Sequence, residues 1–246
     1  MSVTNKGKIT QDIPVLKSAY IKHNIHNQKK EFVDQKQKYY LSLIKKELAI
    51  NSNNTWLLFQ KAKTNFYLNN FDEALIDLTK IINLKNIDDK KIFVGSYILC
   101  ALIFLTINKN ELAIEYLNKS LQIKKSTAAY LFLGDISFKN KDYKSAMTYY
   151  LKLSTKANFL YKDNMFLVSY IENSEKIYKI SSCLLCLNLN IITVIYILLQ
   201  KKKHLSASTF YLLSISFYKI KRISLSKKYL NISKQLDPLW INEFNY

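Results

Sequence analysis

Cys183 and Cys186 form a C-x-x-C pair, the motif in this chain that comes nearest to a metal or redox site. A structural zinc site needs four ligands, usually two such pairs or one pair of cysteines with one of histidines. The chain has no second pair, and leucine and isoleucine surround this one. We therefore expect core thiols and no metal. With Cys100, the chain has three cysteines, an odd number, and all three have apolar neighbours in the sequence. This pattern indicates reduced thiols in a cytoplasmic compartment.

Three histidines are the next residues that could bind a metal or transfer a proton. His23 and His26 would share one face of a helix, but the nearest acidic residues are Asp12, eleven positions before, and Glu31, five positions after. His204 has no acidic residue near it and no clear nucleophile to serve. The pattern favours a solvated N-terminal helix without metal.

Motifs that build catalytic or cofactor sites are missing from the sequence. It contains no phosphate-binding glycine loop, no H-E-x-x-H and no G-x-S-x-G. The acidic residues stand mostly at expected helix starts and turns, where they complement the helix dipole. We predict that the chain is not an enzyme and uses no cofactor.

Helices joined by short polar turns must position whatever site the chain has, because it contains only 3 glycines and 2 prolines. The first 12 residues are polar and lack the apolar core of a secretory signal. Three segments consist of a polar turn, a helix start and an alanine. The alanines are Ala74, Ala113 and Ala146, 39 and then 33 residues apart.

Each of these alanines has a second small residue twelve positions before it: Ala62, Ala101 and Gly134. Small residues at matched places in two helices let the helices cross closely. Large apolar residues recur at helical spacing on both sides of each turn. A fourth copy of the pattern runs from Ala207 to Pro238.

This pattern resembles the tetratricopeptide repeat, a helix–turn–helix unit of about 34 residues. Residues 126–154 match its signature best, with Tyr130, Leu133-Gly134, Tyr143, Ala146 and Tyr150, and the other copies are degenerate. The resemblance implies an all-α fold, an α-solenoid of about five antiparallel helix pairs in a right-handed superhelix.

We expect five units along the chain. These are a polar N-terminal segment or helix (1–29), a partial or capping repeat (30–54), three repeats (55–154), an irregular extra helix near 161–170 with a degenerate repeat (155–206), and a last repeat with a C-terminal stub (207–246).

In the resembled family, the first helix of each repeat lines a concave surface, with repeat positions 2, 5, 9, 12 and 13. Much of this lining is apolar here, which suits an amphipathic helix or an extended peptide, although some of it could instead pack against adjacent repeats. The predicted groove is Trp56, Phe59, Lys63, Phe66, Tyr67, Ile98, Leu102, Leu105, Leu131, Asp135, Phe138, Tyr211 and Tyr218.

Some members of the family clamp the C-terminal carboxylate of chaperones with lysine, asparagine and arginine. The corresponding positions hold Phe59, Lys63, Ala128 and Phe132. The resemblance therefore implies a scaffold or adaptor, or a subunit of a larger assembly, that binds a protein partner without chaperone-tail recognition.

A net charge of +19 leaves two alternatives open. From Lys176 to Leu236 the chain has eleven basic residues and no acidic one. This region is a solvated outer face or a docking surface for an acidic protein segment, RNA or an anionic membrane. Arg222 is the only arginine, which disfavours specific nucleic-acid readout. The predicted basic surface is Lys219, Lys221, Arg222, Lys227 and Lys228.

Residues 180–199 carry no charge and precede three lysines, as a membrane span would. Asn188 and Asn190 near the middle are costly in lipid, and the repeat register places a turn there. We expect two buried helices; the alternative is a membrane-linked assembly factor anchored through 180–199.

Overall fold

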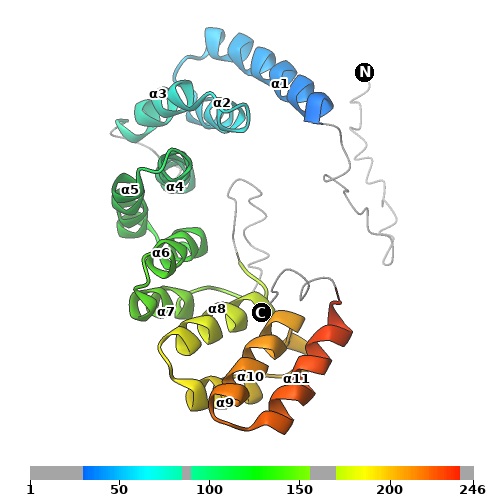
Figure 1. Cartoon of the computed structure of the whole chain (residues 1–246). Helices are drawn as coiled ribbons and strands as arrows, with labels where there is room; N and C mark the ends of the chain where they lie inside the picture. The colour runs from blue at the N-terminus through cyan, green and yellow to red at the C-terminus, as the bar shows by residue number, and fades with distance from the viewer. Residues whose placement is uncertain (1–29, 85–89, 156–169, 239–246) are drawn as a thin grey trace, which may run out of the picture.

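A computed structural model of the chain describes residues 30–84, 90–155 and 170–238. Within these ranges the protein consists of helices and short turns, without strands (Figure 1). One helix, α1 (Lys30–Ile50), precedes five helix pairs. The pairs are α2 (Thr55–Tyr67) with α3 (Phe71–Ile82), α4 (Lys90–Thr106) with α5 (Asn110–Ile123), α6 (Thr127–Lys139) with α7 (Tyr143–Leu151), α8 (Asn173–Cys186) with α9 (Asn190–Leu198), and α10 (Ala207–Lys219) with α11 (Ile223–Leu236). The predicted α-solenoid is confirmed.

The pairs follow one another along a curve, and each packs mainly against its neighbours in the chain (Figure 1). The interior is a series of apolar clusters rather than one central core. Leu58, Ala62, Leu78 and Leu99 belong to the first of these clusters, which joins α2 and α3 to α4. This nearest-neighbour packing is the organisation of a repeat protein.

The same backbone turn connects the two helices in all five pairs. Its central residue has a φ near +60° in each case, a left-handed conformation that asparagine adopts more readily than most residues. The next residue donates its N–H to a carbonyl five positions back, as Asn70 does to Asn65 at 2.9 Å, which closes the end of the first helix. The five residues are Asn69, Asn108, Lys141, Asn188 and Lys221.

Small residues stand where the paired helices cross, as the sequence predicts. Ala62 and Ala101 are fully buried. Gly134 lies beneath the ring of Tyr150, so close that an added Cβ would fall 2.7 Å from the ring carbon Cδ1. The aromatic ring of α7 therefore occupies the volume that any side chain on α6 would need at this place.

Polar caps define where several first helices begin. The side chain of Asn54 accepts a hydrogen bond from the N–H of Leu57 at 3.1 Å, and Ser206 accepts one from Thr209 at 3.3 Å. Each bond satisfies a backbone donor that would otherwise lack a partner in the first turn.

Residues 180–199 do not form one helix. Cys186 ends α8, Asn190 begins α9, and Asn188 in the turn has a φ of 59°. Among the described residues, no helix has the length and apolar character that a bilayer crossing requires. The membrane-span alternative is therefore wrong for this segment, because two asparagines reverse the chain in its middle.

The structure leaves part of the predicted organisation outside its described residues. These parts are segment 1–29 with His23 and His26, residues 161–169 of the predicted extra helix, and residues 239–246. No described helix crosses the predicted borders at 54/55, 154/155 or 206/207. The division into five units stays a prediction.

Candidate functional site

The first helices of the early pairs lie on the inner side of the curve. Figure 1 shows α2, α4 and α6 facing the open side of the arc, with α3 and α5 behind them. A partner that enters the arc would therefore meet first helices, on which the predicted groove residues stand.

Three aromatic residues of the predicted groove are well exposed: Trp56 at 43%, Tyr67 at 50% and Tyr218 at 65%. Lys63 is half-buried. Since Lys63 and Tyr67 follow Trp56 by seven and eleven residues, all three project within about 20° of one line along α2. We call Trp56, Lys63 and Tyr67 the α2 stripe.

Four predicted groove residues are core residues instead: Phe59, Ile98, Leu131 and Tyr211 are all buried. Each occupies the fifth position of its repeat. Phe59 packs in the same apolar cluster as residues of α3 and α4, and Ile98 packs against Ala128 of α6. The structure thus corrects the predicted lining at this position, because these side chains fill contacts between helices rather than the open face.

Other half-buried aromatics of the predicted groove hold helix pairs together. The ring of Phe66 lies 6.0 Å from that of Phe71, and the ring of Phe138 lies 5.2 Å from that of Tyr143, measured between centroids. Leu102 and Leu105 are also half-buried against apolar clusters. Only part of the surface of each of these residues is exposed.

Asp135, another predicted groove residue, links three helices. Its Oδ1 accepts hydrogen bonds from the hydroxyl of Tyr150 on α7 and from Nζ of Lys179 on α8, each at 2.7 Å. Burial, together with the bond to Asp135, raises the pKa of the Tyr150 hydroxyl. The carboxylate therefore has two internal partners that a ligand would have to compete with.

A cavity of about 410 Å³ lies beside one end of the α2 stripe. Tyr67 lines it together with Asn69 and Asn70 from the α2–α3 turn, and α1 supplies Asp34 and Leu41. This cavity is where a side chain of a partner bound along α2 would be accommodated.

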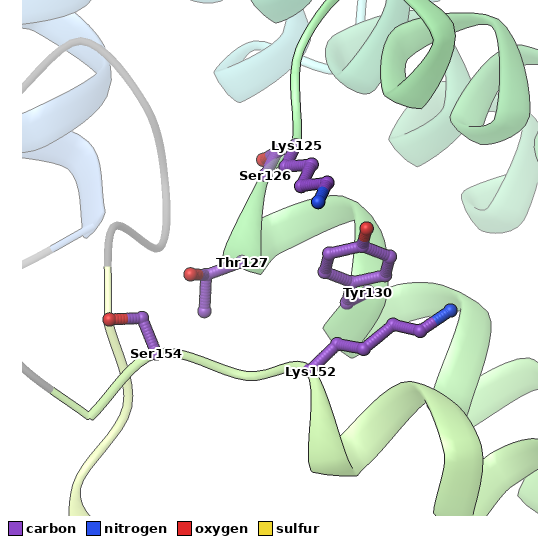
Figure 2. Close-up of a pocket in the computed structure, with 6 residues that line it drawn as sticks. All are labelled: Lys125, Ser126, Thr127, Tyr130, Lys152 and Ser154. Carbon is purple, nitrogen blue, oxygen red and sulfur yellow. The ribbon is translucent and has the colours of Figure 1, made fainter.

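A second cavity, of about 480 Å³, was not predicted from the sequence (Figure 2). The ring of Tyr130 lies between the side chains of Lys125 and Lys152, and Nζ of Lys152 is 5.4 Å from the ring centroid. Ser126, Thr127 and Ser154 complete the lining. Two ammonium groups beside the start of α6 favour an acidic group here. No motif marks this set, because its residues lie at two separate helix ends.

All residues of the predicted basic surface are exposed. They gather around the turn between α10 and α11. Lys219 stands at the end of α10, where a positive charge is favourable, and Arg222 caps the start of α11, where it is not. That this surface docks an acidic protein segment, RNA or an anionic membrane stays a prediction.

The cysteines are free thiols in two environments. Cys100 and Cys183 are buried, whereas Cys186 is exposed at the end of α8, so the expectation of a core thiol is wrong for Cys186. Burial raises the pKa of the Cys100 thiol to about 12. In the part of the chain that the structure describes, no three histidine, cysteine or acidic side chains come together as metal ligands would.

Stacked antiparallel helix pairs with an inner face of first helices define a helical-repeat fold. The family model of the tetratricopeptide repeat matches residues 94–127 and 127–155, which correspond to α4–α5 and α6–α7. The chain therefore contains tetratricopeptide repeats, as its resemblance predicts. A search of curated proteins finds no match.

Solved structures with the same fold are tetratricopeptide-repeat proteins. YrrB, "a TPR protein with an unusual peptide-binding site", is 15% identical, with 80% of this chain and 93% of YrrB covered and a TM-score of 0.57. The C-terminal part of a TPR repeat-containing protein from Cytophaga hutchinsonii is 12% identical, with 84% and 77% covered and a TM-score of 0.61. Such proteins generally mediate protein–protein interactions and assembly.

Proposed function

We propose that this protein is a non-catalytic scaffold that binds a helix or an extended peptide of a partner protein along the inner face of its first helices. The α2 stripe carries the proposal. Trp56 and Tyr67 are exposed at its two ends, about 16 Å apart along the helix axis. Large aromatic side chains of this kind are the residues that most often dominate binding energy in protein interfaces.

The stripe defines the spacing of the partner's anchors. Two large apolar side chains on one side of the ligand would lie about four or six residues apart in an extended segment, or about eleven residues apart in a helix. The +19 net charge and Lys63 within the stripe favour acidic residues around these anchors. That YrrB has a peptide-binding site on the same fold agrees with such a ligand.

Affinity selection of random peptides on the immobilised full chain tests the proposal. We expect selected peptides with two large apolar residues at one of these spacings, and at least about 30-fold weaker binding to the double variant Trp56→Ala, Tyr67→Ser. Ile76→Ser is the matched control, because Ile76 is 68% exposed on α3, behind the inner face.

Phe66 is a poor probe of this site, because it packs against Phe71 and its removal would disturb the fold. The proposal fails if the selected peptides bind the double variant as tightly as the unchanged chain. It also fails if Ile76→Ser weakens binding as much as the double variant does, because the ligand would then contact the second helices of the pairs.

A further inference from the structure

Helix α9 exposes an apolar face that the scaffold function does not use. The residues of this face have exposed fractions from 50% at Ile192 to 78% at Leu199. On a helix these positions fall within an arc of about 120°. No polar side chain interrupts the arc within α9. We call this set the α9 face: Ile191, Ile192, Ile195, Leu198 and Leu199.

The opposite side of α9 joins the solenoid. Thr193, Val194 and Ile197 are buried, and α9 packs against α8 and α10. The repeat therefore needs only one side of this helix for its own stability. A contiguous exposed apolar face on a folded protein marks an interaction site for a protein, a membrane or a ligand.

Positive charge adjoins the α9 face. Lys201, Lys202 and Lys203 follow Leu199 after one intervening residue, Gln200, and are all exposed. In the described part of the chain, these three lysines form no ion pair with a carboxylate. In the helices that pack against α9, acidic residues are confined to the start of α8, where Glu175 lies in the first turn.

We propose that the α9 face docks on the surface of a bilayer that contains anionic lipid, with Lys201–Lys203 at the headgroups. Apolar side chains on one helix face beside a cluster of lysines are the two features that hold a protein at such a surface without crossing it. The face carries aliphatic side chains alone, without the tryptophan, tyrosine or arginine that anchor protein interfaces. A second copy of the chain would bring the same positive charge.

Vesicle co-sedimentation with the full chain tests this docking. The vesicles are phosphatidylcholine alone or a roughly 7:3 mixture with phosphatidylserine, whose negative surface attracts basic segments. We expect binding to the mixed vesicles, weakened by added salt. Lys201→Gln, Lys202→Gln and Lys203→Gln together should lower the partition about 100-fold, and Ile191→Ser, Ile195→Ser and Leu198→Ser at least about 10-fold.

Two matched controls separate docking from general adsorption of a basic protein. Ile76→Ser with Leu112→Ser removes exposed apolar side chains from α3 and α5, and should leave binding unchanged. Replacing Lys219, Lys221 and Arg222 with glutamine removes three charges from the predicted basic surface, and should lower binding less than loss of Lys201–Lys203. Circular dichroism checks that each variant keeps its helicity.

Three results would overturn the proposal. The first is that the unchanged chain does not bind the mixed vesicles. The second is that it binds, but that the α9-face variant binds equally well. The third is that sedimentation shows a dimer that the α9-face variant dissociates, with no vesicle binding, since the face would then join two copies. None of these results bears on the α2 stripe.

Discussion

Gly134→Ala tests the contact between α6 and α7 directly. In most helices this change stabilises the fold by about 1 kcal/mol, because glycine is the weaker helix former. Here the new Cβ would fall 2.7 Å from Cδ1 and closer still to Cε1 of Tyr150, well inside contact distance. The ring has little room to move, since it is 2% exposed and its hydroxyl is bonded to Asp135.

The expected cost follows from these two opposing effects. Overpacking of this kind costs about 1–3 kcal/mol, and the helix-forming gain offsets about 1 kcal/mol of it. Because the ring is fixed, we expect the upper part of this range and a net loss of about 1–2 kcal/mol in the free energy of unfolding. Urea denaturation followed by far-ultraviolet circular dichroism measures the difference.

A double-mutant cycle isolates the contact itself. In a Tyr150→Leu background the ring is gone, so Gly134→Ala should become neutral or stabilising by up to about 1 kcal/mol. The reasoning is refuted if Gly134→Ala stabilises the unchanged chain, or if its effect is the same in both backgrounds.

Three further changes probe the turns, the core and the thiols. Lys141→Gly should stabilise the chain by about 1 kcal/mol in urea denaturation, because its φ of 62° suits glycine; a loss would contradict the turn geometry. Phe59→Ala should cost about 3–5 kcal/mol and Trp56→Ala under about 1 kcal/mol in the same assay; equal costs would contradict their different burial. Ellman's reagent at neutral pH should label Cys186 rapidly and leave Cys100 unlabelled. Burial raises the pKa of the Cys100 thiol from 9.0 to about 12, so its contribution to stability is complete below pH 9.0 and is lost as the pH rises towards about 12. Alkaline unfolding unchanged by Cys100→Ala would contradict this.

The helix pairs could be predicted because their determinants are local. Ala62 and Ala74 stand twelve residues apart, as do Ala101 and Ala113, and a polar residue with a φ near +60° follows the first helix of every pair. The turn at Asn188 was predicted for the same reason, although hydropathy alone indicated a membrane span. The repeat register therefore predicted the structure of residues 180–199 better than their mean hydropathy did.

The exposed surfaces were harder to predict, because they depend on how neighbouring pairs rotate against each other. Phe59 and Trp56 both belong to the concave positions of the family, yet contact with α4 buries Phe59 and leaves Trp56 exposed. The α9 face was missed since Ile195 and Ile197 are equally apolar in the sequence, and only packing distinguishes them. Cys186 was expected in the core because leucine and isoleucine surround it, but it is the last residue of α8 and is exposed there.

The nearest-neighbour packing of the pairs has a mechanical consequence. Described helices far apart in the chain share no substantial contact, so among the described residues the two ends of the arc are connected through the series of junctions between them. A small rotation at each junction adds up to a large change in end-to-end distance, while no single junction deforms strongly. The protein should therefore behave as a soft elastic element, whose curvature a ligand that touches several pairs would fix.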